Sequence, residues 1–168
     1  MSATNNLSRS VEFITQWLVG AIFIGFRFSS NFTLLFDRQT EAGFEGKSLP
    51  WQLRLDLLED WWLGSKQEWT KKVSENGVGV EPDEPVKAYE LAKLRWSEGA
   101  VVESIIANEN KLSILFQDGT VLHALLTEED EFSYSLSENS EDSSDCSCSI
   151  TLDGEGFHLK TSLLTRQP

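Results

Sequence analysis

Lys111 to Leu126, KLSILFQDGTVLHALL, is the stretch of sequence that most directly decides the fold. Apolar and polar side chains alternate on both sides of Asp118-Gly119, a dipeptide that favours a tight turn between two strands. The pattern predicts strands at about 111–117 and 120–126. Because they are joined by a two-residue turn, they must run antiparallel.

The same alternation continues outward along the chain. It predicts further strands at 22–28, 32–36, 51–55, 100–106 and 131–137, and a C-terminal hairpin at 146–164. Helical spacing predicts helices at 7–18, 65–76 and 85–96, a short helical piece at 56–62, and a linker at 76–85. The predicted fold class is therefore α+β, with antiparallel sheets and a few short helices.

The two halves of the chain repeat a pattern, which predicts a duplicated helix-β-β-β unit over residues 7–62 and 85–137 of a single domain, 1–168. Chance similarity between amphipathic strands is the alternative. The repeat also predicts that Trp17 and Trp96 anchor their helices on the sheets, with a ligand-stacking tryptophan as the alternative. The matches are Trp17-Leu-Val-Gly20-Ala21 with Trp96-Ser-Glu-Gly99-Ala100, Phe32/Leu34/Phe36 with Leu112/Ile114/Phe116, and Trp51/Leu53/Leu55 with Phe132/Tyr134/Leu136.

Charge narrows the classes of partner. The 168-residue chain has a net charge of -13, which repels nucleic acid and anionic membranes and attracts basic proteins. The alternative is that the charge serves solubility alone. The longest apolar run, Trp17 to Phe26, is too short to span a membrane, and no signal-peptide cleavage pattern follows it. We therefore expect a cytoplasmic protein, and the sequence leaves its oligomeric state open.

Motifs that carry catalysis or cofactor binding are missing from the sequence. There is no glycine-rich phosphate loop, dinucleotide fingerprint or Gly-x-Ser-x-Gly elbow. His123 shares its alternation with Val121 and Leu125, which predicts a packed or edge histidine. Cys146 and Cys148 are closer together than the cysteines of common zinc sites, so we expect reduced thiols and no metal. We expect no cofactor and no enzymatic activity, although the many scattered carboxylates leave acid–base catalysis open.

Two clusters are candidate partner-binding residues. The first is acidic, Glu128, Glu129, Asp130 and Glu131, and its electrostatic attraction would speed association with a basic partner. The second is Trp61 and Trp62: adjacent residues cannot both face one core, so one ring is expected to be exposed, as binding hot spots often are. The alternatives are an ordinary solvated loop and two rings partly buried between layers.

The Gly-Ala junctions at Gly20-Ala21 and Gly99-Ala100, the hairpin Phe116-Gln-Asp-Gly119 and the acidic balance give the chain a family likeness. It resembles immunity proteins of bacterial contact-dependent and polymorphic toxin systems, and related small β-rich families. Residues 99–136 carry the pattern best, whereas Asp37-Arg38 replaces the Asp-Gly turn in the first half. The resemblance implies a non-catalytic protein that binds and neutralises one cognate toxin, often a basic nuclease.

Our functional hypothesis is thus an interaction protein that occludes a basic partner. The acidic stretch would cover a basic cleft, and Trp61 or Trp62 would fill a pocket. The alternative is a small-ligand-binding or structural accessory protein whose sheets enclose an aromatic pocket.

Overall fold

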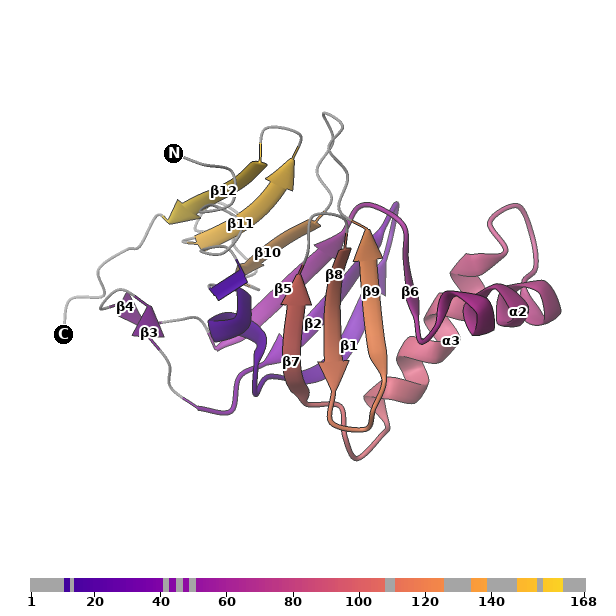
Figure 1. Cartoon of the computed structure of the whole chain (residues 1–168), viewed down its shortest axis with the longest axis horizontal. Helices are drawn as coiled ribbons and strands as arrows, with labels where there is room; N and C mark the ends of the chain where they lie inside the picture. The colour runs from indigo at the N-terminus through magenta and orange to yellow at the C-terminus, as the bar shows by residue number, and fades with distance from the viewer. Residues whose placement is uncertain are drawn as a thin grey trace.

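Antiparallel strands and short helices make up the computed structural model of the chain, shown in Figure 1. It describes residues 11–12, 14–40, 43–44, 47–48, 51–107, 111–125, 134–138, 148–153 and 156–161. The six-stranded sheet has the order β1 (Ile22–Phe28), β2 (Phe32–Asp37), β5 (Gln52–Leu57), β10 (Tyr134–Glu138), β11 (Cys148–Asp153) and β12 (Gly156–Thr161). The four-stranded sheet has the order β6 (Trp61–Leu63), β9 (Val121–Leu125), β8 (Lys111–Phe116) and β7 (Val102–Ala107). The remaining elements are the pair β3 (Gly43–Phe44) and β4 (Lys47–Ser48), helical residues 14–18, α2 (Lys66–Asn76) and α3 (Asp83–Arg95). The predicted α+β class is confirmed.

The core lies between the two larger sheets, which face each other in Figure 1. Buried and half-buried residues alternate along β2, β8 and β9, so one face of each strand points inward. Phe23 of β1 contacts Phe36 at 5.8 Å and Phe116 of β8 at 6.5 Å, measured between ring centroids. These edge-on aromatic contacts join the two layers.

The sheets are also joined along one edge, where β1 and β7 begin. Ile22 forms an isolated antiparallel bridge with Val101, the residue that the repeat places at the same position. The Phe23 amide donates to the Ala100 carbonyl at 2.8 Å, and the Val102 amide donates to the Ala21 carbonyl at 2.9 Å. In the repeat, Phe23 corresponds to Val102 and Ala21 to Ala100, so each of these hydrogen bonds is the counterpart of the other. The two halves are therefore related there by an approximate twofold axis.

Each half contributes strands to both sheets. In the first half, β1, β2 and β5 pair with one another in chain order, and β6 then pairs with β9 of the other sheet. In the second half, β7, β8 and β9 pair in chain order, and β10 then pairs with β5 of the other sheet. The repeated arrangement therefore has four strands rather than three, with β5 and β9 at equivalent places. The sequence match of 51–55 with 132–136 does not follow this arrangement. It relates β5 to β10, two strands that lie side by side, with Leu55 paired with Leu136. A common origin of the halves stays a prediction.

Several local expectations can be compared with the structure directly. The helical piece at 56–62 is wrong, because β5 continues to Leu57 and Trp61–Leu63 forms β6 beside β9. The helix start at Ser65 is confirmed, since its hydroxyl accepts the Glu68 amide. β11 and β12 form the expected C-terminal hairpin.

Within the described part of the chain, no helix combines the length and the apolar character needed to span a bilayer. Residues 7–10 and residues 139–147, which include Cys146, lie outside the described residues.

Candidate functional site

The two adjacent tryptophans of β6 are both covered. Trp61 is 2% exposed and contacts Phe32 at 5.2 Å in the core, whereas Trp62 is 7% exposed on the opposite face of the sheet. The Trp62 ring lies beneath the ammonium group of Lys66, 4.1 Å from its centroid, and beside the His123 ring at 5.5 Å. The rings do face opposite sides, but the expectation that one is exposed is wrong, because α2 brings Lys66 over the outer one. Neither Trp61 nor Trp62 can fill a pocket on a partner.

The acidic candidates lie elsewhere in the chain. Glu128, Glu129, Asp130 and Glu131 fall between β9 and β10, outside the described residues. Their role in partner binding stays a prediction.

Two tryptophans of the described chain are exposed, and Trp96, with 83% of its surface accessible, is more exposed than Trp51 at 51%. It follows directly after α3, whose inward side is already occupied by Val86, Leu91 and Leu94. Its sequence counterpart Trp17 is fully buried among the helical residues of the first half. The expectation that Trp96 anchors α3 is therefore wrong, whereas Trp17 is indeed a core residue.

Backbone and side-chain contacts fix the position of Trp96. The amide of Trp96 donates to carbonyls in the last turn of α3, and the guanidinium carbon of Arg95 lies 5.3 Å from the centroid of its ring. Arg95 is itself held, because its Nε donates to the Ile24 carbonyl of β1 at 2.6 Å. Tyr89, 65% exposed, lies two helical turns earlier on the same side of α3. The ammonium group of Lys93 lies 5.6 Å from the Tyr89 ring centroid, so this aromatic surface carries a cation at each ring.

Two exposed carboxylates lie on the loop that follows this tryptophan and on the loop hydrogen-bonded to it. Glu98 and Asp118 are both exposed. Their loops are adjacent, because the Asp118 amide donates to the Gly99 carbonyl at 3.2 Å. The approach at Gly99 is so close that an added Cβ would lie 2.4 Å from the Asp118 nitrogen. Among the described residues, neither carboxylate has an ion-pair partner. We call Tyr89, Trp96, Glu98 and Asp118 the Trp96 surface.

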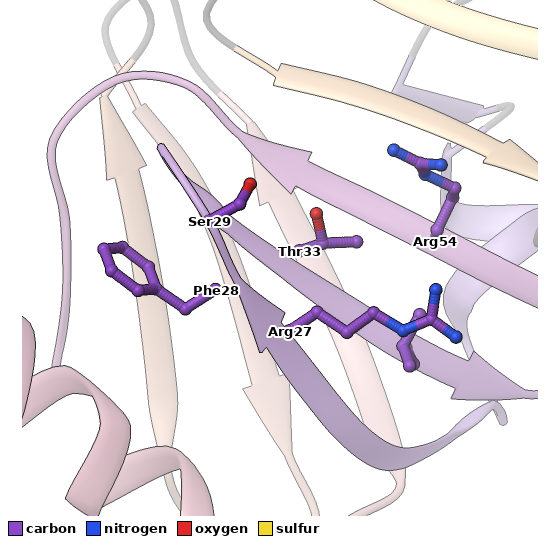
Figure 2. Close-up of a pocket in the computed structure, with 6 residues that line it drawn as sticks. Arg27, Phe28, Ser29, Thr33 and Arg54 are labelled. Atoms are coloured by element: carbon purple, nitrogen blue, oxygen red, sulfur yellow. The ribbon is translucent and has the colours of Figure 1, made fainter.

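A second feature is a hollow of about 310 Å³ on the outer side of β1, β2 and β5. Figure 2 shows its lining, in which Arg27 and Arg54 extend over the strands while the Phe28 ring points away from them. Phe28 packs instead on Phe32, with 4.6 Å between ring centroids. Ser29, Thr33 and Leu35 complete the lining.

His123 lies on the outer face of the four-stranded sheet, as expected for a packed histidine. Its Nδ1 is 2.8 Å from the Ser113 hydroxyl on the neighbouring strand. Burial, and then the positive charge of Lys111, hold the pKa of His123 below its ordinary value. The described residues contain no group of three or more His, Cys, Asp or Glu side chains placed to hold a metal ion.

Comparison with known proteins adds no relative. No protein-family model, curated protein or solved structure matches the chain.

Proposed function

We propose that the chain is a non-catalytic interaction protein of the immunity or antitoxin type, which binds a basic partner such as a cognate toxin and covers its functional site. The observation that carries this proposal is Trp96, 83% exposed at the end of a helix that packs on the core, with two exposed carboxylates, Glu98 and Asp118, on the loops that follow. The net charge of -13 supports a basic partner. The resemblance to toxin-immunity families supports this class of function and a cytoplasmic location.

Trp96 has the properties of a binding hot spot. A buried tryptophan removes on the order of 150–250 Å² from water, which corresponds to about 4–6 kcal/mol before the costs of association. Because the backbone of Trp96 is already held at the end of α3, binding would order mainly its side chain. The ring can also stack with a partner's guanidinium group.

The carboxylates give the same surface its selectivity for positive charge. Lysine or arginine side chains of the partner would pair with Glu98 and Asp118 around the tryptophan. The stretch from Glu128 to Glu131 remains part of the proposal as a source of long-range attraction. Trp61 and Trp62 are removed from the proposed contacts because they are buried.

The alternative of an aromatic ligand pocket between the sheets has no such support. Phe23, Phe36 and Phe116 occupy that space by packing on one another.

The test uses Trp96→Ala and a matched control, Trp51→Ala, which removes another exposed tryptophan. Basic proteins captured from native lysate by the wild-type chain are purified, and their affinities for each variant are measured by calorimetry. We expect Trp96→Ala to weaken binding by about 30-fold or more and Trp51→Ala to leave it within about twofold.

Salt provides an independent measure of the electrostatic contribution. The association rate should fall with ionic strength, and less steeply after Glu98→Gln and Asp118→Asn together. A partner bound equally well by wild type and Trp96→Ala would contradict the proposal, as would a partner without net positive charge.

A further inference from the structure

The hollow on the outer side of the six-stranded sheet is built by cross-strand neighbours. Arg27 of β1 is paired with Thr33 of β2, and Thr33 is paired with Asp56 of β5. In the adjacent row, Leu35 of β2 is paired with Arg54 of β5. Thr33 and Leu35 alternate with three fully or nearly buried residues of β2, so the hollow lies on the side opposite the core.

Arg54 is fixed in this hollow by a network with Asp56. Its Nε lies 3.1 Å from Asp56 Oδ2, and its Nη2 lies 3.0 and 2.9 Å from the two carboxylate oxygens. The Thr33 hydroxyl donates to the same carboxylate. The Arg54 guanidinium is therefore oriented in advance, and its Nη1 has no bond to another described residue. The side chain remains 39% exposed.

Arg27 supplies the second cation of the hollow. It is exposed, and it forms neither an ion pair nor a hydrogen bond with any side chain in the described part of the chain. Figure 2 shows it extending over the same side of the strands as Arg54. Its guanidinium N–H groups are therefore all available to a ligand.

The charges leave a local positive excess in an acidic protein. Two guanidinium groups line the hollow and only one of them, Arg54, is paired with a carboxylate of the described residues, Asp56, while the whole chain has a net charge of -13. At physiological salt, screening limits the electrostatic effect of each charge to a distance of about 8 Å. The local positive excess can therefore attract a small anion although the protein as a whole is acidic. An extended polyanion would instead meet the negative charge of the remaining surface.

We propose that this hollow binds the oxyanion group, phosphate or carboxylate, of a small molecule. Guanidinium groups bind both by paired, charge-assisted hydrogen bonds. A volume of about 310 Å³ is at the lower end of small-molecule sites, which suits a compact metabolite rather than a folded partner. The Ser29 hydroxyl would donate to a remaining oxygen, whereas the Thr33 hydroxyl proton is already donated to Asp56. The site shares no residue with the Trp96 surface, so it stands independently of the proposed function.

The experiment is a titration of the full ¹⁵N-labelled chain with inorganic phosphate, succinate and acetate in separate arms, with chloride used to hold ionic strength constant. We expect saturable shifts of the amide signals of Arg27 to Ser29 and of Thr33 to Leu35, with a Kd on the order of 1 mM for the preferred anion. A preference for phosphate over succinate would identify a phosphate ester as the ligand class, and the reverse a dicarboxylate.

Variants locate the binding. Arg27→Gln should weaken it by about tenfold, Arg27→Lys by less because the charge remains, and Lys71→Gln, which removes an exposed cation of α2, should have no effect. Arg27 is on the surface, so its replacement should leave the fold intact, which the spectrum of the free variant checks. Shifts that stay linear in every arm, or equal affinity for wild type and Arg27→Gln, would overturn the proposal.

Discussion

Trp17 and Trp96 show how matching residues acquire different roles. Both precede a Gly-Ala junction, yet Trp17 is buried and Trp96 is 83% exposed. Trp17 lies within the helical residues, whereas Trp96 lies beyond the last residue of α3. Leaving so large an apolar ring in water has no stabilising effect on the fold, which is why we connect it with binding.

Lysine side chains explain why the adjacent tryptophans of β6 are unavailable to a partner. Lys66 lies over Trp62, and Lys87, itself 7% exposed, lies 5.0 Å from the ring centroid of Trp61. Asp60 pairs with both ammonium groups, and Asp83 lies 2.6 Å from Lys87. The lysine stems cover apolar surface while their charges remain paired.

His123 gives a prediction about acid stability. Burial first, and the charge of Lys111 second, hold its pKa below the ordinary value of 6.5 in the folded chain. The unfolded chain therefore takes up this proton at a higher pH than the folded chain does. Stability is present above about pH 6.5 and falls as the pH is lowered toward the folded pKa.

The measurement is chemical denaturation of wild type and His123→Gln at several pH values from about 7.5 to about 5.5. Glutamine can still bond Ser113 but does not titrate, so the variant should lose less stability across this range. Carboxylates contribute equally to both proteins. Identical pH dependence of the two would show that His123 titrates alike in the folded and unfolded chains.

At the scale of elements, α2 begins at a side-chain cap. The Ser65 hydroxyl accepts the Glu68 amide at 3.2 Å and lies 2.9 Å from the Glu68 carboxylate. Trp69 is the buried residue of this helix, so α2 depends on few core contacts and its cap matters correspondingly more.

We expect Ser65→Ala to lower the free energy of unfolding by about 1 kcal/mol, because one helix amide loses its acceptor. Ser65→Thr, which keeps both the acceptor for the Glu68 amide and the donor to the Glu68 carboxylate, should stay within about 0.5 kcal/mol of wild type. Urea denaturation followed by circular dichroism measures both. Equal losses in the two variants would mean that the hydroxyl acts otherwise than as a cap.

The short strand β6 shows where pattern analysis of elements fails. Three buried residues, Trp61 to Leu63, contain too little periodicity to separate a strand from a helical turn. Pairing with β9 decides the conformation, because it supplies hydrogen-bond partners that the local sequence cannot.

At the scale of the whole molecule, the crossing strands interlock the halves. β6 of the first half completes the sheet of the second, and β10 of the second pairs with β5 of the first. Neither half contains its own four-stranded sheet, so neither can bury its core surface alone.

Separating the chain between Gly79 and Val80, in the connection between α2 and α3, tests this arrangement. Val80 is 95% exposed, so the cut itself removes few contacts. We expect the fragments 1–79 and 80–168 to show no cooperative thermal transition alone and to recover one when mixed in equal amounts. A cooperative transition of either fragment by itself would show that the halves fold independently.

Alternation and turn chemistry by themselves determined the α+β class, most strands and the start of α2, because side-chain periodicity and caps act over a few residues. They also predicted that His123 is a packed or edge histidine of a strand. The crossing of β6 and β10, the covering of Trp62, the exposure of Trp96 and the meeting of Arg27 with Arg54 were decided by tertiary structure alone. Each depends on segments distant in sequence, and local preferences carry no information about which distant segment will supply a neighbour.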